Sequence, residues 1–145
     1  MKTYDALQEW LREQGCPSHV VKAGLKGLSM TWDKIVAELV FDGYRYGLKD
    51  FVNDMDRRQM LAGALARGAE LELEVPPALA SRIASTDQRF LDATWRTSRC
   101  LLDEEVVTER RIDPARHWWY YRVPRRRRGF IVKDLDAAGI TTIET

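Results

Sequence analysis

Hydrophobic side chains recur with helical spacing through most of the chain, and the clearest such stretch lies in its middle. Between residues 48 and 67 they return every three or four positions, which is the spacing of one face of an α-helix. The members of this stripe are Leu48, Phe51, Val52, Met55, Ala62 and Leu65. The pattern predicts a helix of about five turns, and we expect the other elements to pack around it.

The segment before this central helix is predicted to form three shorter helices. Apolar positions that begin at Tyr4 indicate a first helix that ends near Gly15, and Pro17 is suited to open a second. Thr31 has a side chain typical of an N-cap and is expected to start the third. Turn-forming residues 42–47 then lead into the central helix.

A different pattern follows the central helix. In residues 69–75 leucine and valine alternate strictly with glutamate, which is typical of an extended segment. Pro76 and Pro77 favour the start of a long helix that runs to about residue 102. One carboxylate, that of Asp87, falls on the apolar face of this predicted helix.

The last part of the chain is predicted to contain a small β element. Residues 117–123 are rich in aromatic side chains that favour strands. An arginine-rich stretch separates them from the apolar residues 130–132, which suggests a hairpin. Residues 103–116 show no clear pattern, and residues 134–145 are expected to add a short helical turn and a tail. The fold class is therefore predicted to be α+β, predominantly α, as one domain with about five helices around a central helix.

Length and composition describe an ordinary globular domain. With 145 residues, 45% of them hydrophobic and 31% charged, the chain can bury a core without metals or disulfides. The net charge of +1 creates no long-range field toward nucleic acid or an anionic membrane. Cys16 and Cys100 match no metal-site spacing and are expected to stay reduced. The chain carries no signal-peptide pattern and no apolar run of membrane-spanning length, so we expect a cytoplasmic protein with no membrane partner.

Asp87 is the most unusual charged residue, because an isolated charge on an apolar face is costly to bury. We predict an ion pair with Arg122, whose guanidinium can hold a carboxylate with two hydrogen bonds. The alternative is a general acid or base that works with His117 in a small hydrolase. No second carboxylate or nucleophile is tied to Asp87 by spacing, so the structural pair is favoured and no catalytic residue is assigned.

Acidic residues also cluster in the first half of the central helix. Asp54 precedes Arg58 by four residues, which predicts a helical ion pair. Asp50, Asp54 and Asp56 could alternatively form a magnesium site, but Arg57 and Arg58 beside them favour internal neutralisation. The phosphate-binding glycine loop, the dinucleotide motif and the serine elbow are absent from the sequence, and we expect neither a metal nor a cofactor.

The strongest electrostatic feature is an arginine run that follows the aromatic segment. It consists of Arg125, Arg126, Arg127 and Arg128. Basic side chains next to aromatic ones can bind single-stranded nucleic acid, whereas arginine loops also dock on acidic protein surfaces. The near-neutral net charge disfavours a dedicated nucleic-acid binder. A second candidate contact region is acidic and contains Glu70, Glu72 and Glu74.

Four short motifs occur in a recognisable order along the chain. They are GCPxxVVxxGL at residues 15–25, FVNDMDxR at 51–58, DxRF at 87–90 and WWYYRVP at 118–124, and the predicted helix that contains Trp32 lies between the first two. The set resembles a loose family of small bacterial proteins with a YLNDLDxR-type helix, whose members often look like immunity proteins of polymorphic or contact-dependent growth inhibition toxin systems. This chain departs from the pattern where Phe51 and Val52 replace the usual tyrosine and leucine, and in its arginine run.

The resemblance implies a scaffold role for the shared charged positions and a variable set of toxin contacts. The shared positions are Asn53, Asp54, Asp56, Arg58, Asp87, Arg89 and Arg122. Our first hypothesis is therefore a cytoplasmic immunity protein, not an enzyme, that occludes a cognate toxin domain by complementary contact. The alternative is a nucleic-acid-binding module that uses the arginine run and the aromatic residues beside it.

Overall fold

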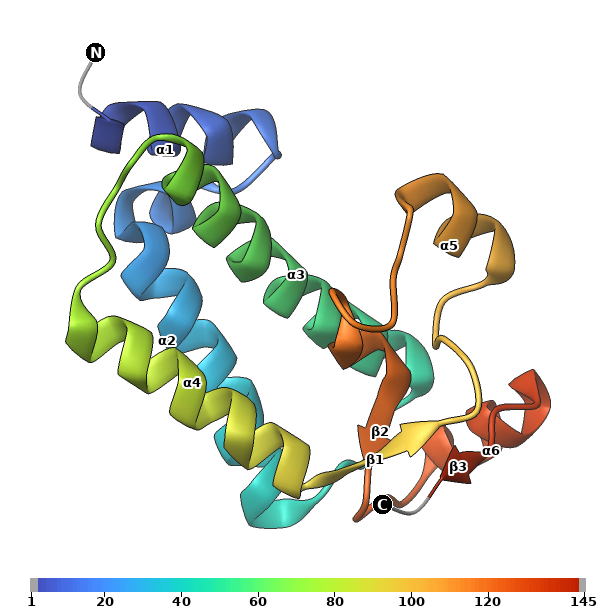
Figure 1. The fold of residues 1–145 in the computed structure, drawn as a ribbon. Helices are drawn as coiled ribbons and strands as arrows, with labels where there is room; N and C mark the ends of the chain where they lie inside the picture. The colour runs from blue at the N-terminus through green and yellow to red at the C-terminus, as the bar shows by residue number, and fades with distance from the viewer. Residues whose placement is uncertain (1–2, 144–145) are drawn as a thin grey trace.

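Helices account for most of the fold, and a three-stranded sheet lies at one end of the helical layer (Figure 1). The computed structural model describes residues 3–143, with side chains from residue 5 onward; the side chain of Tyr4 and the last two residues of the expected tail lie outside the described residues. The elements are α1 (Thr3–Glu13), α2 (Ser18–Asp42), α3 (Leu48–Glu70), α4 (Pro77–Asp92), β1 (Thr94–Thr97), α5 (Glu104–Arg110), η1 (Trp118–Tyr121), β2 (Arg122–Pro124), α6 (Phe130–Ala138) and β3 (Thr142–Ile143). The predicted class, α+β and predominantly α, is confirmed.

The central helix predicted from the sequence is α3, and it forms over the predicted residues with one further turn. It packs against α1 and α2 on one side and contacts α6 and η1 on the other, so it joins the helical layer to the C-terminal part. Phe51 and Met55 of the predicted stripe are buried. Farther along the helix the fully buried positions are Leu61 and Ala64, whereas their predicted neighbours Ala62 and Leu65 are only partly buried.

The second and third of the three helices predicted before α3 form one helix, α2, with a bend. The bend lies at Gly24, where φ is 60° and ψ is −147°, a conformation that is essentially restricted to glycine. Thr31 is not an N-cap, because its hydroxyl donates a hydrogen bond of 3.1 Å to the carbonyl of Gly27 within the helix. The boundary predicted between the two helices, at Thr31, therefore lies seven residues after the observed bend at Gly24.

Residues 69–75 are not a strand, although their alternating pattern suggested one. Helix α3 continues to Glu70, and the chain then turns with Glu72 in a left-handed conformation (φ 58°). The amide of Leu73 donates back to the carbonyl of Gly68 at 2.8 Å, which closes the helix end. Leu71 and Leu73 pack against the core and the glutamates remain exposed, so a turn produces the same alternation as a strand.

Helix α4 ends at Asp92, ten residues earlier than the sequence predicted. Residues 94–97 leave the helix to form β1, which pairs antiparallel with both β2 and β3. The hydroxyl of Thr94 donates a hydrogen bond of 2.8 Å to the carbonyl of Phe90 at the helix end. Threonine and tryptophan favour strands, and pairing with distant residues decides their conformation.

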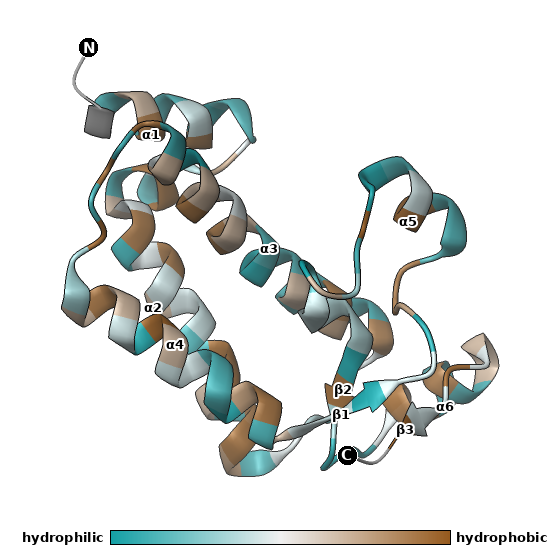
Figure 2. Ribbon diagram, in the orientation of Figure 1, coloured by the Kyte–Doolittle hydropathy of each residue, from teal (hydrophilic) through white to brown (hydrophobic). Residues whose placement is uncertain are grey.

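The predicted C-terminal hairpin is also wrong. The aromatic residues 118–121 form the 3-10 helix η1, and only Arg122–Pro124 are a strand, with β1 as its partner. The apolar residues 130–132 begin helix α6 instead of a second hairpin strand. The unassigned residues 103–116 contain α5, which is largely hydrophilic (Figure 2) and buries none of its side chains fully. Among residues 3–143, none of the helices combines the length and apolarity needed to cross a membrane.

Candidate partner-binding site

The buried charge of Asp87 is paired, but its partner is Arg58 and not Arg122. The Nε and Nη2 atoms of Arg58 each donate a hydrogen bond of 3.0 Å, one to each carboxylate oxygen of Asp87. The indole Nε1 of Trp32 donates a third bond of 2.8 Å. The predicted helical pair between Asp54 and Arg58 is therefore wrong as well, since Arg58 turns into the core where α2, α3 and α4 meet.

Aromatic rings surround the same guanidinium. Its central carbon lies 4.5 Å from the ring centroid of Trp119, 5.5 Å from Trp118 and 5.9 Å from Trp32. These cation–π contacts favour the charged guanidinium in an apolar setting. Arg58 thus holds the 3-10 helix η1 to the helical layer, and its arrangement with Asp87 is that of a structural ion pair.

Arg122 does not pair with Asp87 as predicted, and it binds instead at the end of α4. Its Nε donates to the hydroxyl of Thr94 at 2.7 Å, and its Nη2 donates to the carbonyls of Thr94 and Leu91 at 2.9 and 3.2 Å. These carbonyls can accept the bonds of Arg122 because α4 ends at Asp92, so no later turn of the helix uses them. A cation is favourable at the carbonyl end of a helix, so Arg122 caps α4 from strand β2.

The other candidate catalytic or metal-binding residues, His117, Asp50 and Asp56, form structural hydrogen bonds. The ring nitrogen Nδ1 of His117 accepts a hydrogen bond of 2.9 Å from the amide of Asp113, and burial lowers the pKa of the imidazole. Asp50 accepts the amide of Gly47 at the start of α3, and Asp56 accepts the hydroxyl of Tyr120 at 2.5 Å. Within residues 3–143 there is no group of three or more potential metal ligands that could hold an ion.

The arginine loop, residues 125–128, is an ordered segment that lies beside the α2–α3 connector. The amide of Tyr44 donates to the carbonyl of Arg126 at 2.8 Å, and the amide of Arg128 donates to the carbonyl of Tyr44 at 2.9 Å. Farther along, the amide of Ile131 donates to the carbonyl of Tyr46 at 3.0 Å. Two backbone hydrogen bonds therefore fix the loop against the connector, and a third fixes the start of α6 just beyond it.

Two glycines allow this close approach. Gly43 and Gly129 have φ values of 74° and 77°, in the left-handed region that favours glycine. A Cβ atom at Gly43 would lie 3.0 Å from the carbonyl oxygen of Arg126, and one at Gly129 would lie 3.0 Å from that of Arg45. Any larger residue would push the two segments apart.

The arginine side chains are also placed by contacts. The guanidinium groups of Arg125 and Arg127 lie 5.9 and 5.7 Å from the ring centroid of Trp95 on β1. Arg128 forms a salt bridge of 3.1 Å with Asp42, the same carboxylate that pairs with Arg45 at 3.2 Å. The loop therefore presents a positive surface with a defined shape.

Two of the four aromatic residues that precede this loop do not extend its surface. Trp119 is 2% exposed and Tyr120 is fully buried. Their rings pack in the core, so they cannot stack on the bases of a nucleic acid beside the arginine loop. Trp118 and Tyr121, the other two aromatic residues of this segment, are half-buried, because η1 turns the segment toward α3.

Exposed aromatic residues lie instead on three other segments, which the sequence analysis did not select. Phe41 is 87% exposed at the end of α2, Tyr46 is 57% exposed in the connector, and Phe130 is 70% exposed at the start of α6. The sequence contained a signal for one of them, because Phe41 falls outside the helical stripe formed by Trp32, Val36 and Leu39. The other two became neighbours only through the folding of the loop.

These aromatic side chains and the arginine loop share one surface. Phe41 and Tyr46 line the same cavity, and Phe130 starts the turn that bonds to the carbonyl of Tyr46. We call this surface the aromatic–arginine face. Its members are Phe41, Arg45, Tyr46, Arg125, Arg126, Arg127, Arg128 and Phe130.

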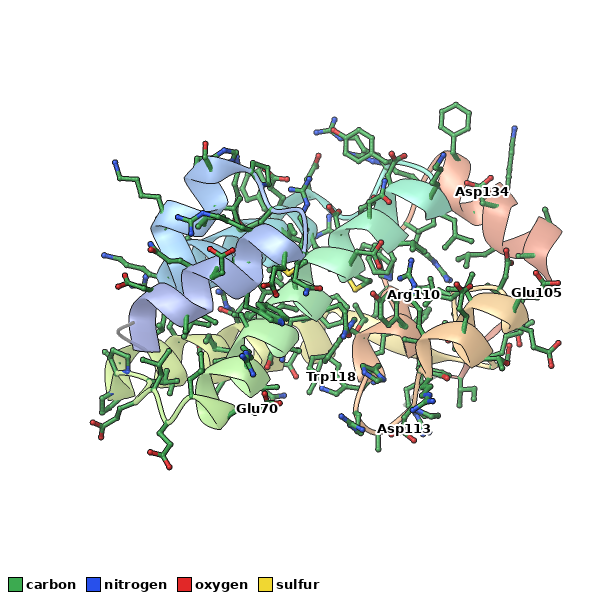
Figure 3. All side chains as sticks on the ribbon, turned by 90° about the horizontal axis from the view of Figure 1, so that it is seen from above. Glu70, Glu105, Arg110, Asp113, Trp118 and Asp134 are labelled. Carbon is green, nitrogen blue, oxygen red and sulfur yellow. The ribbon has the colours of Figure 1, made fainter. Side chains whose placement is uncertain are left out.

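The acidic candidate region lies elsewhere. Glu70, Glu72 and Glu74 are all exposed, and Glu70 pairs with Arg67 at 2.8 Å. This region follows the C-terminal end of α3, whereas the arginine loop lies near the N-terminal end of α3 (Figure 1). Figure 3 shows the same separation, with Glu70 at the lower left and Asp134, which accepts the amide of Leu48 at the start of α3, at the upper right. The two predicted contact regions are therefore not brought together.

Comparison of the chain with protein-family models, with curated proteins and with solved structures finds no match. The buried charges of Arg58 and Asp87 already satisfy one another. On the aromatic–arginine face, large exposed aromatic side chains lie near Arg125, Arg126 and Arg127, which pair with no carboxylate within the described residues. This face is our candidate functional site.

Proposed function

We propose that the protein is a binding protein, and specifically a cytoplasmic immunity protein that occludes a cognate toxin domain. One observation carries the proposal: three exposed aromatic side chains lie within a few residues of the backbone hydrogen bonds that hold the arginine loop. Aromatic residues and arginine are enriched at the energetic centres of protein interfaces. Solvent exposure of Phe41 and Phe130 has a cost that a partner surface removes.

The fixed backbone of the arginine loop supports tight binding. Ordering a flexible loop at an interface costs free energy, and a loop that is already ordered avoids most of that cost. The hydrogen bonds of Tyr44 to Arg126 and Arg128 supply this order before any partner arrives. Inhibition by occlusion requires this kind of contact and no chemistry from the inhibitor.

The charge of the face indicates the partner's chemistry. In the described part of the chain, the arginine loop and Arg45 share one salt-bridged carboxylate, that of Asp42. The face thus keeps an excess of positive charge. A complementary partner presents an acidic surface, and opposite charges speed the encounter of two proteins.

Under this proposal, the gene of this chain lies beside one that encodes the toxin domain, and the test uses that domain and the double substitution Phe41→Ala/Phe130→Ala. We expect wild-type protein to form a complex with the domain and inhibit it. The double variant should bind at least about thirtyfold more weakly, equivalent to about 2 kcal/mol for the loss of interface anchors. Met30→Ala is the matched control, since Met30 is 54% exposed in the middle of α2. Equal affinity of the double variant and wild type would contradict the proposed face.

A further inference from the structure

A cavity opens on the aromatic–arginine face between the end of α2 and the start of α3. Its volume is about 300 Å³, which is at the small end of the range for ligand pockets. Aromatic rings form part of its wall, from Phe41, Tyr44, Tyr46 and Phe51. A cavity of this size suits one side chain of a partner.

Tyr44 lines this cavity, and its hydroxyl group has no hydrogen-bond partner in the described chain. The residue is 8% exposed and its Oη atom is buried. Its ring is fixed edge-on against Phe51, at a centroid distance of 5.2 Å, and against Tyr46 at 5.7 Å. A buried hydroxyl without a partner is costly, so this atom identifies a place where a polar ligand would gain a hydrogen bond.

Carboxylates give the cavity a negative charge. Glu38 and Asp54 line its wall, and neither forms a salt bridge within the described residues. Burial raises the pKa of Asp54 to about 6; Arg57 opposes this shift, and Glu38 and Asp50 add to it. A positive charge in the cavity would stabilise the ionised carboxyl.

The cations around the cavity do not supply that charge. Arg45 is the one basic residue in the lining, and its guanidinium pairs with Asp42 at 3.2 Å. The same group lies 5.9 Å from the ring centroid of Tyr46, at the rim. The carboxyls of Glu38 and Asp54 are thus left without a bonded cation.

We infer that this cavity receives one basic side chain, a lysine or an arginine, that the partner protein presents. Its ammonium or guanidinium group would donate to the carboxylates of Glu38 and Asp54 and to the oxygen of Tyr44, while the rings of Phe41 and Tyr46 cover its stem. The identity of the presenting molecule rests on the proposed function; the binding of the cation does not. A basic anchor in an otherwise acidic partner surface fixes the register of the complex.

The test is an NMR titration of the full chain with small side-chain analogues. N-acetyl-arginine methylamide and N-acetyl-lysine methylamide are the probes, and the norleucine and glutamate derivatives are the neutral and anionic controls. We expect at least one of the basic probes to produce saturable shifts of the amides of residues 41–46 and 54, with a dissociation constant on the order of 1–10 mM. The controls should produce none. Absence of saturation with both basic probes, or equal shifts with norleucine, would overturn the inference.

Two substitutions locate the binding site. Asp54→Asn should weaken the probe at least about fivefold, and Asp5→Asn, an exposed aspartate of α1 at the far end of the molecule, should leave it unchanged. Tyr44→Phe removes only the unpartnered hydroxyl and leaves no new buried group unsatisfied. It should fold normally and weaken the probe at least twofold. Unchanged probe affinity in folded Tyr44→Phe and Asp54→Asn would contradict the assignment.

The two proposals fail separately. If the probe binds but Phe41→Ala/Phe130→Ala leaves toxin binding unchanged, the proposed interface is wrong and the cation site stands. If the double substitution weakens the complex and the probe does not bind, the interface stands and the cation site is wrong.

Discussion

Arg58 is a buried cation that combines an ion pair with Asp87 and cation–π contacts with tryptophan rings. Its Nε and Nη2 atoms bind both oxygens of Asp87, while its remaining terminal nitrogen, Nη1, is buried without a hydrogen bond. The rings of Trp118 and Trp119 face the guanidinium and offset part of that cost. The pair therefore specifies how the C-terminal segment meets the helices.

Removal of one partner should be strongly destabilising. We expect Asp87→Ala to lower the free energy of unfolding by about 3–5 kcal/mol, because it leaves the charge of Arg58 buried and uncompensated. Arg58→Met/Asp87→Leu should recover a large part of the loss. Urea denaturation measures both. A loss no greater than that of Glu9→Ala, which breaks an exposed pair with Arg12, would show that the buried pair contributes little.

Asp54 gives the stability a defined dependence on pH. Its pKa is raised to about 6 in the folded protein, above the value of about 3.9 in an unfolded chain. Between these values the folded state binds more protons, so this group's contribution to stability is greatest below pH 4 and is lost as the pH rises to about 6. The unfolding free energy of wild type minus that of Asp54→Asn should therefore fall between pH 4 and 6.5 and stay constant above. A difference that rises with pH would contradict the shift.

At the scale of elements, periodicity predicted the helices that bury one face. Helix α3 was predicted because Phe51 and Met55 follow the spacing of a helix that faces the core. Periodicity failed at residues 94–97, and the strand preference of aromatic residues failed at 118–121; long-range contacts decide the conformation of both segments. Strand β1 forms because it pairs with β2 and β3, and the sequence of residues 94–97 does not indicate these distant partners.

Only part of the candidate site could be predicted, because local sequence patterns do not show which distant residues meet in the fold. The arginine run is evident because its four residues are consecutive in the sequence, and these residues are part of the candidate face. The partner of Asp87 was missed because Arg58 is 29 residues away on a different helix, and no local pattern connects them. Phe130 and Tyr46 become neighbours through backbone bonds between two loops, which sequence spacing cannot indicate.

The bend of α2 at Gly24 provides a test at this scale. We expect Gly24→Ala to destabilise the protein by about 1–3 kcal/mol, since an L-residue is strained at φ 60° and ψ −147°. Gly68→Ala is the control: Gly68 lies inside α3, and an added Cβ would only reach ordinary contact with Leu73 at 3.8 Å. It should change stability by no more than about 1 kcal/mol. Thermal unfolding compares the two, and equal effects would mean that the bend carries no strain for alanine.

At the scale of the whole molecule, charge is separated along α3. The positive arginine loop lies near the helix's N-terminal end and the exposed glutamates follow its C-terminal end (Figure 1). The chain is nearly neutral, with a net charge of +1, so this separation and not the total charge gives the surface its polarity. Such an arrangement orients an approaching partner.

The arginine loop should therefore affect how fast a partner binds. We expect Arg126→Gln/Arg127→Gln to slow association with the toxin domain several-fold at low salt and to reduce the salt dependence of that rate. Stopped-flow fluorescence measures the rate. The same variant tested on single-stranded DNA addresses the alternative function: a steep salt-dependent affinity of wild type that the variant loses would favour nucleic acid over a protein partner.

The location of the interface is tested most directly by hydrogen–deuterium exchange of the protein with and without the bound toxin domain. We expect the complex to slow exchange in residues 41–47 and 125–131, the backbone of the aromatic–arginine face, and to leave residues 69–75 unchanged. Slower exchange at residues 69–75, with residues 41–47 and 125–131 unaffected, would place the partner on the glutamate end and contradict the proposed face.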